Sequence, residues 1–319
     1  GLAEVQAVGQ GNAQARRQRM LVAQVQGQAP AVLHRRLPPH GRSPQAGLDE
    51  NRQLFLDWHG TADGRITVMM GPHAPYTCPP DYLHKFVDQA RELGAEIHIH
   101  LSETKGEVEN IKQQYGKSPI ALMDEIGVLD CGCLAAHCVW VDDDDMDIMA
   151  AKHVRVAHNP GSNLKLASGI TPVAELLQAG VNVGIGTDGS ASNNKLDMLA
   201  ETRMAALLAK VGTLDPTVVP AATALRMATL NGAQALGMAD KIGSLEAGKC
   251  ADMIAINLNA VETAPAFDPI SHVVYAAGRE QVEHVWVNGR HVLKQRQLAT
   301  VDYAAWLQRA EAWRHKVVG

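Results

Sequence analysis

The chain has 319 residues, enough for one α/β barrel domain and a smaller appended unit. Its net charge of −5 argues against a nucleic-acid-binding or anionic-membrane surface as the main function, and no apolar run approaches the ~18 residues of a membrane span. Five cysteines and the absence of an export signal at the start predict a cytoplasmic protein without a disulfide framework.

Residues 1–47 differ in composition from the rest of the chain. Glutamine and unmatched arginines are concentrated there, Glu4 is the only acidic residue before Asp49, and no helix or strand period holds. This composition predicts a disordered or poorly packed segment. A segment that is replaced or read out of frame is the alternative, because the change near Leu48 is abrupt.

From residue 48 the apolar pattern becomes orderly, and the first half of a domain over 48–238 follows. Helical spacing ends repeatedly on glycine, as at Gly94, Gly116 and Gly127, which is typical of helix C-termini. Short runs with strand-like alternation lie between these helices. The pattern predicts helices at 50–59, 80–93, 108–115 and 119–126, and strands at 66–70 and 96–101.

The second half of this domain repeats the alternation. Strands are predicted at 134–141, 153–158 and 181–187, helices at 172–180, 196–211 and 220–236, and loops at 159–163 and 188–194. Alternating strands and helices are typical of parallel βαβ units, so the expected fold is α/β, a (β/α)8 TIM-type barrel.

Residues 239–319 have a different character. Strands are predicted at 251–258 and 282–293, the latter turned at Asn288-Gly289, which is a strong hairpin signal. A terminal helix is predicted at 303–315, with Trp306 and Trp313 on its buried face. This region is expected to form a small β unit packed beside the barrel.

Each predicted strand ends on or just before an ionisable residue: His73, His100, His137, His158 and Asp188. In a (β/α) barrel the C-terminal ends of the strands build the active site. Imidazole and carboxylate together suit Zn²⁺ or Fe²⁺ with an open position for water, which such a metal activates near neutral pH.

Two of these strand ends add groups that can take part in the hydrolytic step. Glu103 follows the strand that ends near His100 and is placed to act as a general acid and base. His137 is placed to hydrogen-bond a metal-bound hydroxide or a developing oxyanion. The sequence therefore predicts hydrolytic chemistry at this end of the sheet.

Four motifs contain the residues at the ends of the later strands: His-Ile-His-Leu-Ser-Glu-Thr at 98–104, Ala-His-Cys at 136–138, His-Asn-Pro-Gly-Ser-Asn-Leu-Lys-Leu at 158–166 and Gly-Thr-Asp-Gly-Ser-Ala-Ser-Asn-Asn at 186–194. These motifs resemble those of the amidohydrolase superfamily, and within it those of the 5-methylthioadenosine/S-adenosylhomocysteine deaminases. The loop Gly-Pro-His-Ala-Pro-Tyr at 71–76 and the tail at 242–249 strengthen the resemblance, which covers roughly residue 49 to the C-terminus.

The resemblance implies a role for each strand-end residue. His100 and Asp188 would bind one divalent metal ion, zinc before iron, manganese or nickel, and Asp188 would accept the proton of the attacking hydroxide. Glu103 would contact the purine and carry a proton to its ring nitrogen, His137 would orient the hydroxide, and His73 would contact the nucleoside. Hydrolysis at C6 of an adenosine derivative would release ammonia and an inosine-type product. The implied partner is a small-molecule nucleoside, with no nucleic acid and no membrane, and a homo-oligomer stays open.

The sequence departs from the family at one point. The family begins its barrel with a His-x-His pair that supplies two metal ligands, but before His73 only the single histidines His34, His40 and His59 occur. We therefore expect a barrel that lacks its first strand or strands, weak metal binding and feeble or no activity. Alternatives are a chlorohydrolase or aminohydrolase of triazines or other heterocycles, a guanine or cytosine deaminase, and a non-catalytic fragment. The segment 162–165 and His158 are expected to shape the pocket.

Overall fold

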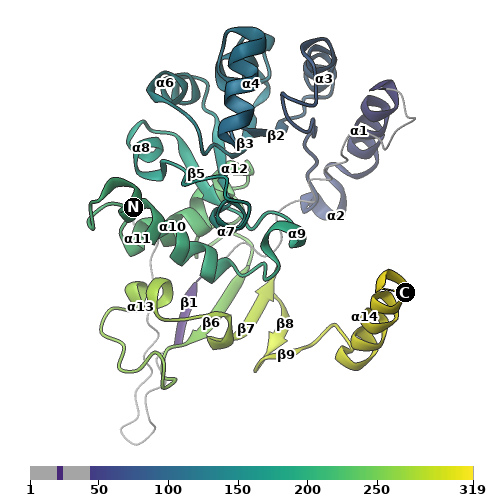
Figure 1. Cartoon of the computed structure of the whole chain (residues 1–319). Coiled ribbons are helices and arrows are strands. Elements are labelled where there is room, and N and C mark those ends of the chain that lie inside the picture. The colour runs from purple at the N-terminus through teal and green to yellow at the C-terminus, as the bar shows by residue number, and fades with distance from the viewer. Residues whose placement is uncertain (1–19, 24–43, 319) are drawn as a thin grey trace, which may run out of the picture. The chain divides into compact units, whose positions relative to one another are not determined.

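The computed structural model describes residues 20–23 and 44–318, and these form two compact units. One unit contains residues 44–239, and the other contains residues 20–23 and 240–318. Each unit has its own sheet (Figure 1).

The first unit is built on a four-stranded parallel sheet in the order β2-β3-β4-β5. The strands are parallel and lie in sequence order, and each connection between them contains at least one helix, as a parallel crossover requires. They are short: alternate residues are buried in β2 and β4, every residue is buried in β3, and the last three residues are buried in β5. Their bounds are Ile97–Leu101 for β2, Cys133–His137 for β3, Arg155–His158 for β4 and Asn182–Ile185 for β5.

The helices of this unit begin and end where local chemistry places their caps. Thr104, Ser118 and Asp142 cap the first turns of three helices, and Gly94 ends another with a φ of 64°. The helices are α1 Pro44–Trp58, α2 Thr61–Gly64, α3 Pro80–Leu93, α4 Lys105–Tyr115, α5 Pro119–Ile126, α6 Asp143–Ala151, α7 Pro160–Lys165, α8 Val173–Gln178, α9 Ser190–Asn193, α10 Met198–Thr213, α11 Ala221–Arg226, η2 Met227–Asn231 and α12 Gly232–Ala235.

The two sides of the parallel sheet end differently. Beside β2, only Met70 pairs with Ile97, so the strand predicted at 66–70 is reduced to a single bridge. Beside β5, the side-chain amide of Asn231 donates to the carbonyl of Val183 at 3.2 Å. The π-helical segment η2 thus occupies this edge through side-chain hydrogen bonds. In the described residues the parallel sheet has four strands and this bridge, and does not close into a barrel.

Other observed helices differ in their boundaries from the predicted elements. The loops predicted at 159–163 and 188–194 contain the short helices α7 and α9. Pro160 stands in the first turn of α7, where a missing N–H costs no hydrogen bond, so the proline favours a helix start there. The helix predicted at 220–236 forms as α11, η2 and α12 in succession.

The second unit holds a five-stranded antiparallel sheet in the order β1-β6-β7-β8-β9. The predicted hairpin forms between β7 and β8, and Asn288 and Gly289 both have a positive φ, as such a turn requires. The elements are β1 Met20–Ala23, β6 Met253–Asn257, α13 Pro269–Tyr275, β7 Val282–Val287, β8 Arg290–Lys294, β9 Gln297–Leu298 and α14 Tyr303–Val318.

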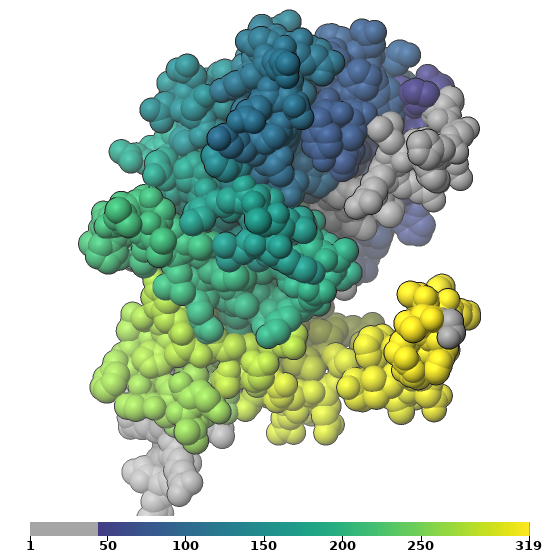
Figure 2. All heavy atoms as spheres, viewed as in Figure 1, coloured from purple at the N-terminus to yellow at the C-terminus, as the bar shows by residue number. Residues whose placement is uncertain are grey.

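Within the segment of unusual composition, Met20–Ala23 forms a strand that pairs antiparallel with β6. Of the rest of 1–47, residues 44–47 belong to α1 and the others lie outside the described residues. One expectation for this unit was wrong. The terminal helix forms, but Trp306 and Trp313 are 53% and 64% exposed. Their spacing puts them on one face, yet a buried face also needs an opposing element. The atoms of α14, yellow in Figure 2, are uncovered in that view.

Among the described residues, no helix is long and apolar enough to cross a membrane.

Candidate active site

The first part of the site lies at the end of β2. His98 and His100 alternate with fully buried apolar residues and therefore share the other face of the strand. The Nδ1 of His100 lies 2.7 Å from the carbonyl oxygen of His73. A carbonyl only accepts hydrogen bonds, so Nδ1 carries the proton of this ring. Burial lowers the pKa of His100, while the charges of Glu103 and Asp188 oppose that shift.

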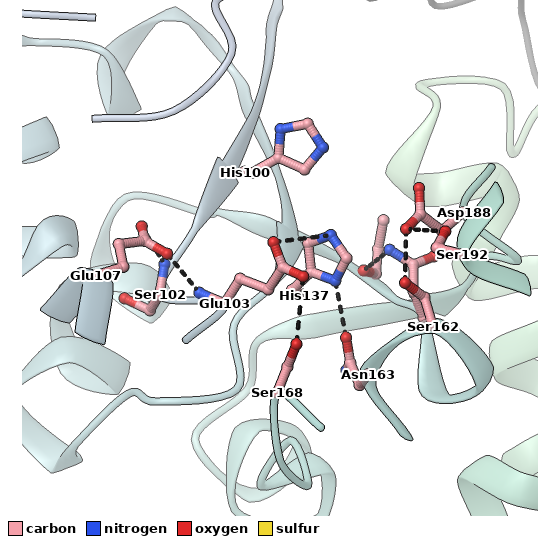
Figure 3. Close-up of polar contacts among 12 residues, drawn as sticks. His100, Ser102, Glu103, Glu107, His137, Ser162, Asn163, Ser168, Asp188 and Ser192 are labelled. Atoms are coloured by element: carbon pink, nitrogen blue, oxygen red, sulfur yellow. Dashed lines mark hydrogen bonds and ion pairs between the residues drawn. The ribbon is translucent and has the colours of Figure 1, made fainter. Parts of the chain in front are cut away.

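A buried histidine at the end of β3 lies against this first part. His137 is 1% exposed, and its ring stacks on that of His100 with 5.5 Å between centroids. Its Nε2 lies 3.8 Å from Oε2 of Glu103. The other oxygen of this carboxylate accepts a hydrogen bond from Ser168 at 3.3 Å. Glu103, predicted to move protons, and His137, predicted to hydrogen-bond the hydroxide, are therefore neighbours (Figure 3).

Asp188 follows β5 and is held by three hydrogen bonds. Its Oδ2 accepts from the hydroxyls of Ser162 and Ser192, each at 2.7 Å, and its Oδ1 accepts from the N–H of Gly189 at 2.7 Å. Burial acts to raise the pKa of Asp188, but these hydrogen bonds outweigh it and hold the pKa below its usual value. Asp188 is therefore ionised at neutral pH.

His158 ends β4 and is 1% exposed. Neither of its ring nitrogens has a hydrogen-bond partner among the described residues. Burial lowers the pKa of His158 to about 3, so the ring is neutral. His73 lies beside His100, with 5.1 Å between ring centroids.

One buried carboxylate beside the site was missed by the sequence analysis. Glu107 is 5% exposed and accepts hydrogen bonds from the backbone N–H groups of Ser102 at 3.0 Å and Glu103 at 2.8 Å. The Thr104-x-x-Glu107 pattern, a capping-box signature at the start of α4, could have revealed it. Glu107 thus fixes the backbone from which the Glu103 side chain extends.

Glu107 makes the stability of the protein depend on pH. Burial raises the pKa of Glu107 from 4.5 to about 7, against the hydrogen bonds that it accepts. The folded state then holds this proton over a range in which the unfolded state has lost it, so the contribution to stability is fully present below 4.5 and is lost as the pH rises through about 7. Glu107→Gln cannot titrate. We expect the free energy of unfolding of the native protein to fall relative to that of the variant across this window, as measured by urea unfolding at several pH values. If the free energy of unfolding of the native protein minus that of the variant stayed constant or rose with pH, this expectation would be contradicted.

Among the described residues, the side chains predicted to bind a metal ion form an incomplete set of ligands. His100 and Asp188 both lie at the site, but no group of three or more His, Cys, Asp or Glu side chains in the described ranges is placed to hold a metal ion. A zinc site normally has at least three protein ligands. The described residues alone therefore do not fit a complete metal site.

The structure brings the predicted residues together. Glu103 and His137 are in contact, His100 stacks on His137, and both carboxylates, of Glu103 and Asp188, lie within electrostatic reach of His100. Figure 3 shows these four residues in one view. They come from the C-terminal ends of β2, β3 and β5, as the order of strands predicted.

Comparisons with known proteins identify the family of the chain. The model of the amidohydrolase family matches residues 13–292. The 5-methylthioadenosine/S-adenosylhomocysteine deaminase of Desulforudis audaxviator is 52% identical over 274 residues, which are 86% of this chain and 64% of that protein. A zinc-bound adenosine deaminase from Xanthomonas campestris has a TM-score of 0.81 and 42% identity over 85% of this chain and 61% of its own. The zinc complex of atrazine chlorohydrolase from Arthrobacter aurescens has a TM-score of 0.78 and 26% identity, over 85% and 60%.

The extent of these matches differs from that of the motifs. The chain spans less than two thirds of the length of each of these three relatives. The family match begins at residue 13, within the segment of unusual composition, and not near residue 49. The resemblance seen in the motifs is confirmed, and the chain belongs to the amidohydrolase family.

Proposed function

We propose that the protein is a metal-dependent aminohydrolase that removes the amino group from the adenine ring of an adenosine derivative, 5′-methylthioadenosine or S-adenosylhomocysteine. The observation that carries the proposal is the Glu103–His137 contact at 3.8 Å, beside a carboxylate, Asp188, that is held ionised. The names of the relatives support the substrate class.

Asp188 and Glu103 carry out the proton transfers of the proposed reaction. Asp188 accepts a proton from the attacking water, and Glu103 carries a proton to the ring nitrogen next to C6. C6 becomes tetrahedral. Asp188 then passes its proton to the amino group, the C6–N bond breaks and ammonia leaves, while the hydroxyl on C6 gives its proton to Glu103 and the C6=O bond of the inosine-type product forms. His137 orients the water, and His73 contacts the nucleoside.

Metal binding sets the level of activity in this proposal. His100 and Asp188 are the proposed ligands, and no His-x-His pair precedes His73 in the sequence. A protein that consists of these 319 residues is therefore expected to bind zinc, iron, manganese or nickel weakly and to turn over slowly. In the same proposal, β2–β5 and Met70 are part of a partial (β/α)8 barrel over 48–238 that lacks its first strand or strands, with 239–319 as a C-terminal unit.

The test compares this protein with a version to which a family-type first-strand segment with a His-x-His pair is fused. Zinc content after equilibrium dialysis and ammonia release from 5′-methylthioadenosine are measured for both. We expect metal and deamination to rise together in the extended version. Tight, near-stoichiometric metal and robust turnover without the extension would contradict the weak-site proposal.

The same experiment separates the alternatives. Turnover of a chlorotriazine, guanine or cytosine in place of the adenosine derivative would contradict the proposed substrate class. A metal-loaded extended protein that turns over none of these compounds would favour a non-catalytic module.

A further inference from the structure

A closed ring of hydrogen bonds connects the side chain of His137 to its own backbone carbonyl. The Nδ1 of His137 lies 2.8 Å from Oδ1 of Asn163, the amide nitrogen of Asn163 lies 3.2 Å from the hydroxyl of Thr171, and that hydroxyl lies 3.0 Å from the carbonyl oxygen of His137. All three residues are 1% exposed. Asn163 belongs to α7, and Thr171 lies in the loop before α8, so three separate segments meet in the ring.

The direction of every hydrogen bond in this ring follows from one group. The carbonyl oxygen of His137 only accepts, so the hydroxyl of Thr171 must donate its single proton there. The oxygen of that hydroxyl then accepts from the amide NH₂ of Asn163. This orients Asn163 with its carbonyl oxygen toward His137, and an oxygen acceptor at Nδ1 requires a proton on Nδ1.

The opposite tautomer has a specific cost. To accept at Nδ1, the ring would need the NH₂ group of Asn163 turned toward it, which leaves the hydroxyl of Thr171 facing an amide oxygen as well as the carbonyl of His137. One proton cannot satisfy two acceptors, and an unsatisfied polar group at 1% exposure is strongly unfavourable. The ring therefore favours one tautomer over the other.

We propose that Asn163 and Thr171 are positioning residues that hold His137 in the Nδ1–H tautomer, which leaves the lone pair of Nε2 on the side of Glu103, where it can accept a hydrogen bond from the attacking water. The Nε2 lies 3.8 Å from the carboxylate, and the backbone of His137 has a positive φ of 74°, a conformation that the hydrogen bond from Thr171 to its carbonyl holds in place. The position of the proton on the ring therefore depends on the backbone conformation of the turn that ends β3. The catalytic consequence rests on the proposed function, but the tautomer does not.

The tautomer can be measured without any turnover. In the 319-residue protein labelled with ¹⁵N-histidine, a protonated ring nitrogen gives a pyrrole-type chemical shift and an unprotonated one gives a pyridine-type shift. The signals of His137 are assigned by their loss in His137→Gln. We expect a pyrrole-type shift for Nδ1 and a pyridine-type shift for Nε2. The reverse pattern would overturn the proposal.

Substitutions at Thr171 test whether the ring causes the preference. Thr171→Val keeps the shape and removes the hydroxyl, and we expect the ratio of the two tautomers to fall about tenfold, the equivalent of one hydrogen bond, so that the two shifts move toward each other. Thr171→Ser keeps the hydroxyl and is expected to restore the native shifts. Thr229→Val is the matched control, because this buried threonine bonds only carbonyls of its own helix. An unchanged tautomer in a folded Thr171→Val protein would overturn the proposal.

Folding and activity are followed separately. The ring signals of His158, which is 1% exposed in the same unit as Thr171, report whether the variants remain folded. In the extended, metal-loaded version, Thr171→Val is expected to lower kcat about tenfold with little change in KM, and Thr171→Ser to recover it. A shifted tautomer with unchanged kcat would overturn the catalytic role of the ring. Absence of turnover in every version, with the tautomer as expected, would contradict only the proposed function.

Discussion

Replacing Glu103 by glutamine is expected to lower kcat for ammonia release by about 10²–10⁴-fold, the usual contribution of a positioned general acid and base. Glutamine has nearly the same size and can still contact Ser168 and His137, but it cannot carry a proton to the purine ring. KM is expected to change much less than kcat. The measurement uses steady-state ammonia release from 5′-methylthioadenosine by the extended, metal-loaded protein.

The control for this experiment is Glu109→Gln. Glu109 lies on α4, its side chain is 64% exposed, and its ion pair with Lys105 at 3.6 Å is a surface contact of little energetic weight. The control is expected to keep the parent activity. If the Glu103 variant retained more than about a tenth of the parent kcat, Glu103 would not be the group that carries the proton.

A second large effect, on stability, is expected when Glu201 is replaced by alanine. Glu201 is 2% exposed and accepts hydrogen bonds from the N–H of Gly161 at 2.8 Å and from the side-chain amide of Asn193 at 2.7 Å. Loss of the carboxylate leaves two polar groups without their partner, at about 1–3 kcal/mol each, so we expect the free energy of unfolding to fall by about 2–6 kcal/mol. Urea unfolding measures this change.

The same substitution is expected to loosen the surroundings of Asp188. Gly161 and Asn193 lie on α7 and α9, the two short helices that also carry the serines bonded to Asp188. Faster amide hydrogen exchange in both helices would show this effect. Glu175→Ala, an exposed acid on α8, is the control and should change neither quantity. A Glu201→Ala protein with native stability and native exchange in α7 and α9 would show that the carboxylate does not connect them.

The sequence by itself determined the order of the elements and the residues at the ends of the strands. Apolar period, N-caps and C-terminal glycines are local properties, and they located β2–β5, α3, α5 and the β7–β8 hairpin. Because parallel strands present the same end to one side, the residues following them, Glu103, His137 and Asp188, were predicted to meet, and they do. The motifs around them were specific enough to indicate the family.

The tertiary structure decided everything that depends on what faces a side chain. Glu201 is 40 residues from Gly161, and Thr171 is 34 residues from His137, so no local pattern relates them. The exposure of Trp306 and Trp313 depends on an opposing surface, which helical spacing does not specify. Closure of the barrel is likewise a property of strand partners and not of any one strand. Local chemistry therefore determined where each functional group stands in the chain, whereas burial and hydrogen-bond partners, which arise only on folding, determined its protonation and orientation.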